Sequence, residues 1–114
     1  MIYKYGDFSN NQISETKKLM RKKIFYLLLC VDPKTCNEHK DTDIIKAFDS
    51  TLREFGGLND ILFHPTPLVR IISLLEAALV EVSNPDFTTN DFEHCAYRKL
   101  VLDAGAEVMN IKEV

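Results

Sequence analysis

Three carboxylates lie where two packed helices could bind a divalent metal. Drawn as helices, the segments 67–82 and 90–112 place Glu76 and Glu107 inside their apolar sectors, and Asp103 lies one turn before Glu107. Carboxylates on facing helices are typical ligands of Mg²⁺ or Mn²⁺, and a charge among apolar side chains is costly without a partner. Such a site would suit attack of metal-bound water on a nucleotide or another phosphate ester.

The same carboxylates have a simpler interpretation as ion pairs of helix surfaces. Asp103 follows Lys99 by one turn, and Glu76 could meet an arginine of another segment. The spacings from Glu76 to Glu81 and from Asp103 to Glu107 differ from the paired E-x-x-E and E-x-x-D motifs of helical nucleotide pyrophosphohydrolases. We therefore expect no bound cofactor, and a Mg²⁺- or Mn²⁺-dependent nucleotide or phosphate hydrolase remains the alternative.

Cysteine and histidine residues form the second set with chemical potential. Both residue types bind zinc, and four of them would complete a tetrahedral site, but their spacing matches no strong zinc pattern. An odd number of cysteines favours free thiols, with zinc, a local disulfide between Cys30 and Cys36, or a Cys–His nucleophile as the open alternatives. The set comprises Cys30, Cys36, His39, His64, His94 and Cys95.

A basic cluster is the third feature, because five of the seven residues from 17 to 23 are cationic. Lys17, Lys18, Arg21 and Lys22 cover one broad face of a helix, which could meet an acidic partner or a phosphate backbone. A solvated face is the structural interpretation. The net charge of −3 and the lack of interleaved aromatic residues argue against nucleic acid as the main partner.

The chain breakers separate these residues into helical segments. All four prolines fall between stretches that repeat apolar residues every three to four positions. We predict an all-α fold, a compact bundle of four main helices plus one short helix, in a single domain over residues 1–114. The expected helices cover residues 9–31, 41–55, 67–82 and 90–112, and the short helical turn covers 58–63.

The helix ends are predicted from local signals. Capping boxes are expected at Ser9 and at Asn90, each with its partner three residues later, and a cap at Asp41. Gly56-Gly57 is expected to end the second helix, and Thr66 followed by proline to begin the third.

Two segments make predictions about packing. The run Ile24–Val31 is apolar all round, so we expect it to be buried at the bundle centre or in a subunit interface; a short buried strand is the competing interpretation. Small residues at Ala77-Ala78 and around Gly105 predict a close crossing of the third and fourth helices.

Composition bounds the function class without naming a function. An apolar fraction of 46% and a longest apolar run of eight residues predict a soluble, cytoplasmic protein with no membrane span. We expect a small intracellular binding or regulatory protein that acts through protein–protein contacts without catalysis. Its partner is an unknown protein, and a homo-oligomer through the first helix is a second expectation.

Overall fold

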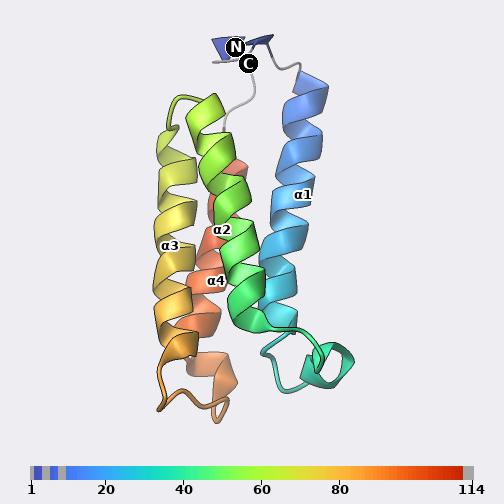
Figure 1. Ribbon diagram of the computed structural model, residues 1–114, viewed down its shortest axis with the longest axis vertical. Helices are drawn as coiled ribbons and strands as arrows, with labels where there is room; N and C mark the ends of the chain where they lie inside the picture. The colour runs from blue at the N-terminus through green and yellow to red at the C-terminus, as the bar shows by residue number, and fades with distance from the viewer. Residues whose placement is uncertain (1, 4–5, 8–9, 112–114) are drawn as a thin grey trace.

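Four antiparallel helices account for most of the chain in the computed structural model, which describes residues 2–3, 6–7 and 10–111. The helices are α1 (Asn10–Leu29), α2 (Ile44–Ile61), α3 (Thr66–Ser83) and α4 (Ala96–Glu107). They run up and down in sequence order, with α2 in front of α4 in the view of Figure 1. The prediction of an all-α bundle with four main helices is confirmed.

Short elements connect and extend the helices. A two-residue antiparallel pair, β1 (Ile2–Tyr3) with β2 (Gly6–Asp7), precedes α1. Single 3₁₀ turns follow at η1 (Cys36–His39), η2 (Phe92–His94) and η3 (Val108–Asn110). The run Ile24–Val31 is helical to Leu29 and ends in a turn at Cys30 and Val31, so it does not form the alternative strand.

The core gathers around Tyr97 of α4, which is almost completely buried. Its ring makes edge contacts with Phe48 and Phe87 and a tilted contact with Phe92. Its hydroxyl donates a 2.6 Å hydrogen bond to the carbonyl oxygen of Leu27. Tyr97 therefore links the end of α1 to the α3–α4 side of the bundle.

The oxygen of Leu27 needs this outside donor because α1 tightens at its end. The amide of Val31 would reach that oxygen in a continuous α-helix, but it donates to the carbonyl of Leu28 instead, at 3.1 Å. A buried carbonyl left without a donor is costly, so the tyrosine hydroxyl stabilises the last turn of α1.

The glycine pair in α2 does not end the helix as predicted. α2 continues through Gly56 and Gly57 to Ile61, and the expected short helix at 58–63 is its last part. Buried Phe55 and half-buried Leu58 pack on the core, and this tertiary burial outweighs the low helix propensity of glycine. The chain turns only at Phe63 and His64, which have positive φ angles of 60° and 57°.

Three predicted helix starts also differ from the structure. Asp43, rather than Asp41, caps α2, and its carboxylate accepts from the amides of Ile45 and Lys46 at 3.1 and 3.2 Å. The predicted cap at Asn90 is wrong: α4 starts at Ala96 after the η2 turn, and the Cys95 thiol accepts from the amide of Arg98.

The third start shifts by one residue, because Thr66 is the first residue of α3 and its hydroxyl makes no capping bond. The capping box expected at Ser9 lies outside the described residues.

Helices α3 and α4 pack extensively, as predicted. The prediction that Gly105 lies at their contact is wrong, because Gly105 faces α1. A methyl group at Gly105 would meet the side chains of Ile24 and Phe25 on α1, at 3.7 and 4.0 Å. These are ordinary van der Waals distances, so close helix approach does not require glycine here.

Candidate partner-binding groove

An apolar groove runs between α1 and α2 on the surface of the bundle. Its larger part has a volume of about 510 Å³. The α2 side contributes the small residues Ala47, Ser50 and Thr51. The α1 side contributes Leu19, Lys22, Lys23, Phe25, Tyr26 and Leu29. We call this surface the α1–α2 groove.

The groove exposes one side of the apolar half of α1. Ile24 and Leu27 face inward and are 1% and 0% exposed, whereas Phe25 and Leu29 are 41% and 38% exposed. Leu19, one to two turns earlier, is 52% exposed. The bundle thus covers only half of this segment, and a contiguous apolar surface of this kind is typical of interaction sites.

The groove continues toward the start of α1. A second hollow of about 190 Å³ shares Leu19 and Lys23 with the first and extends to Thr16 on α1 and Leu58 on α2. From Thr16 to Leu29 along a helix is a distance of about 20 Å.

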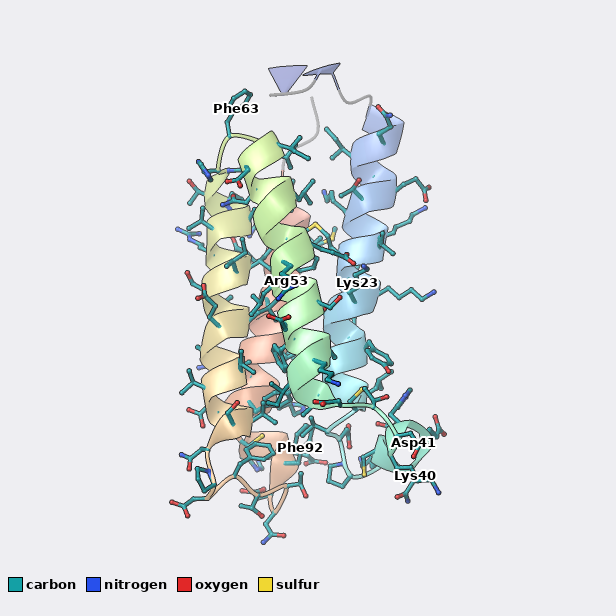
Figure 2. The ribbon with its side chains drawn as sticks, viewed as in Figure 1. Lys23, Lys40, Asp41, Arg53, Phe63 and Phe92 are labelled. Carbon is teal, nitrogen blue, oxygen red and sulfur yellow. The ribbon has the colours of Figure 1, made fainter. Side chains whose placement is uncertain are left out.

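Lys23 spans the junction of the two hollows. Its ammonium group pairs with the carboxylate of Glu54 on α2. Figure 2 shows Lys23 between the two helices. Because both side chains are partly exposed, this ion pair adds little to the stability of the fold. It places two charges that offset each other across the otherwise apolar groove.

Tyr26 closes the other end of the groove through contacts with the α1–α2 loop. Its hydroxyl lies 2.9 Å from the hydroxyl of Thr42, and its ring makes an edge contact with His39. These contacts fix the orientation of the ring, and 37% of the residue stays exposed.

Cys30 lies beneath this end of the groove. Burial raises the pKa of its thiol above the ordinary value of 9.0, against hydrogen bonds from Tyr26 and Thr42 that lower it. The thiol therefore stays protonated at neutral pH, which is the opposite of the environment of a nucleophilic cysteine. All three cysteines are free, so the Cys30–Cys36 disulfide alternative is wrong.

The three predicted metal-binding carboxylates have different surroundings. Glu76 and Asp103 are exposed. The Glu107 side chain is 17% exposed, and its buried oxygen lies 3.5 Å from the guanidinium of Arg70 without hydrogen-bond geometry. Within the described ranges, no three Asp, Glu, His or Cys side chains lie close enough together to bind one metal ion. This holds for the carboxylates and for the cysteine and histidine residues considered as zinc ligands. The structure does not bring these three residues together, and the metal site stays a prediction.

Glu76 is exposed because it lies on a side of α3 that faces solvent, where apolar residues are exposed as well. Its neighbour Val80 on the same face is 71% exposed, and Val69 is 42% exposed. The helical period places Glu76 between Ile72 and Val80 in an apolar sector, whereas the buried face of α3 follows Leu68, Ile71 and Leu75.

The predicted basic face is divided among several partners. Lys17 donates to the carbonyl oxygen of Ile111 at 2.9 Å. Lys18 pairs with Glu15 at 3.6 Å, and Arg21 lies 3.7 Å from the sulfur of Met109. Lys22 projects at the rim of the α1–α2 groove and has no ion-pair partner among the described residues.

The groove contains residues that the sequence placed on a helix without indicating their exposure. The all-round apolar character of Ile24–Val31 was the available signal, and it predicted either a bundle centre or an interface. The structure shows that one side of the segment lies in the core and the other side is open.

Among the described helices, none is long and apolar enough to cross a membrane. No protein family, curated protein or solved structure matches this chain.

Proposed function

We propose that this protein is a small binding or regulatory module that recognises a protein partner through the α1–α2 groove. One observation carries the proposal: Leu19, Phe25, Tyr26 and Leu29 remain exposed together along a groove of about 510 Å³. Large apolar side chains left open in a concave surface gain free energy when a partner covers them. The expected localisation of such a module is the cytoplasm.

The two other functions have less support from the geometry. A metal-dependent hydrolase would need Glu76, Asp103 and Glu107 to converge, but two are exposed and the third faces Arg70. Nucleic-acid binding would need a free cationic face, but Lys17 donates a hydrogen bond to the carbonyl oxygen of Ile111.

Site-specific crosslinking tests the groove directly. A photoreactive amino acid replaces Ser50 on the α2 wall or, as the matched control, Ser73 on α3; both serines are exposed and helical. In cells that express the protein, the Ser50 variant is expected to capture a partner that the Ser73 variant does not. The partner is then purified for a binding measurement.

A matched pair of surface variants completes the test. Leu19→Ser removes an apolar groove residue that is 52% exposed, and Val80→Ser removes one on α3 that is 71% exposed. Loss of a well-packed apolar contact should weaken partner binding about tenfold in Leu19→Ser and leave Val80→Ser unchanged. Equal affinity of both variants would exclude the groove as the binding site.

A further inference from the structure

We infer that the occupant of the α1–α2 groove is an amphipathic helix of a partner protein, with acidic residues flanking its apolar stripe. This inference rests on the proposed function and adds the shape and charge of the partner.

The dimensions of the groove suit a helix. The two connected hollows extend from Thr16 to Leu29 on α1, about 20 Å, which is the length of a helix of about 14 residues. A helix laid into such a groove buries apolar residues spaced three and four apart.

The two walls of the groove leave room for large side chains of the partner. Bulky residues come from α1, including Phe25 and Leu29, whereas α2 contributes Ala47 and Ser50. A ridge of large apolar residues on the incoming helix can pack over the small residues of α2 and against the side chains of α1.

The charges around the groove favour an acidic partner. Glu54, the acid among the residues that line the two hollows, already pairs with Lys23 on this chain.

Two cations complete the rim, and neither has an ion-pair partner in the described part of the chain. Lys22 lines the groove from α1, and Lys46 lies one helical turn before Ser50 on α2. Lys22 and Lys23 against the single acid Glu54 make the lining of the two hollows cationic, although the whole chain has a net charge of −3. Carboxylates that flank the apolar stripe of a partner helix would meet these two lysines.

The same rim disfavours a second copy of the chain as the occupant. A symmetric dimer through this face would bring Lys22 and Lys46 of both copies to one interface. Like charges held together at an interface cost free energy.

Three synthetic peptides of about 14 residues test the inference. They share one helical apolar stripe and differ only at the flanking positions, which are Glu, Gln or Lys. Binding is measured at low salt from the NMR shifts of the backbone amides of Leu29, Ala47 and Ser50. The Glu peptide is expected to bind roughly tenfold more tightly than the Lys peptide, with the difference reduced at high salt.

Charge reversal provides the matched control. Lys22→Glu should reduce or reverse the preference for the Glu peptide. Lys99→Glu makes the same change of net charge at an exposed position of α4 and should leave the preference intact.

The outcomes separate this inference from the proposed function. Equal shifts with all three peptides would overturn the acidic partner and leave the groove proposal standing. If no peptide shifts the groove amides, the inference of a helical partner is overturned. The crosslinking experiment at Ser50 then decides separately whether the groove binds a protein at all. Concentration-dependent shifts without peptide, together with a dimer in sedimentation, would assign the groove to a second copy and overturn the inference.

Discussion

Replacing Gly56 and Gly57 by alanine should stabilise the protein. Both glycines lie inside α2, and neither has the positive φ angle that would favour glycine. A methyl group at either position would have no neighbouring atom within 4 Å, so neither substitution causes a clash. The substitutions change only the conformational freedom of the backbone and the surface of the helix.

The magnitude follows from helix propensity. Alanine is more favourable than glycine inside a helix by about 0.5–1 kcal/mol, so the double variant should gain about 1–2 kcal/mol. A chain of this length has an unfolding entropy of about 240 cal/mol/K. The midpoint of thermal unfolding should therefore rise by about 4–8 °C.

Circular dichroism at the helix band, followed during heating and in urea, measures this change. Gly105→Ala is the matched control in α4, where the methyl group would make ordinary contact with Ile24 and Phe25 and the gain should be similar per residue. If the alanine variants of α2 unfold at a lower temperature than the natural chain, Gly56 and Gly57 end the helix in a left-handed conformation. The reasoning from the continuous helix would then be refuted.

Four further changes have defined expectations. Phe63→Gly should raise stability by about 1 kcal/mol in urea unfolding, because residue 63 has a φ of 60° and is 60% exposed; a decrease would contradict the strained turn. Tyr97→Phe should lower the free energy of unfolding by about 1–3 kcal/mol, since Leu27 loses its donor, and an unchanged midpoint would count against that bond. The hydrogen bond to Asp91 raises the pKa of His94 above 6.5, and an NMR titration should show a lower value in Asp91→Asn. This pair stabilises the fold below the unfolded-state pKa, and its contribution disappears as the pH rises through the folded-state pKa. Chelator-stripped protein should unfold at the same temperature with and without Mn²⁺; a rise that is absent in Glu107→Ala would instead support the metal site.

The helices were predictable because their apolar periodicity is strong. The inward residues of α2 and α4, such as Phe48, Phe55 and Val101, are buried as the 3.6-residue repeat predicts. Helix ends were predicted less well. Gly56-Gly57 resembles a stop signal locally, but the packing of Leu58 and Leu62 keeps the helix intact beyond it.

The candidate site depended more on tertiary structure. The helical period places Glu76 between Ile72 and Val80 in an apolar sector, yet Val80 is 71% exposed. Apolar character alone does not decide burial, because a folded protein leaves many apolar atoms on its surface.

The sequence by itself determined that this chain forms four helices and that the segment Ile24–Val31 must find apolar surroundings. Only the tertiary structure decided that the opposite side of that segment stays open to solvent. The helical spacing of Ile24, Leu27 and Val31 predicts the side of the segment that is buried. Phe25 and Leu29 are equally apolar, so residue type alone does not predict that their side stays exposed. The position of α2 makes that distinction, because its small residues Ala47, Ser50 and Thr51 leave a groove beside the exposed side of α1.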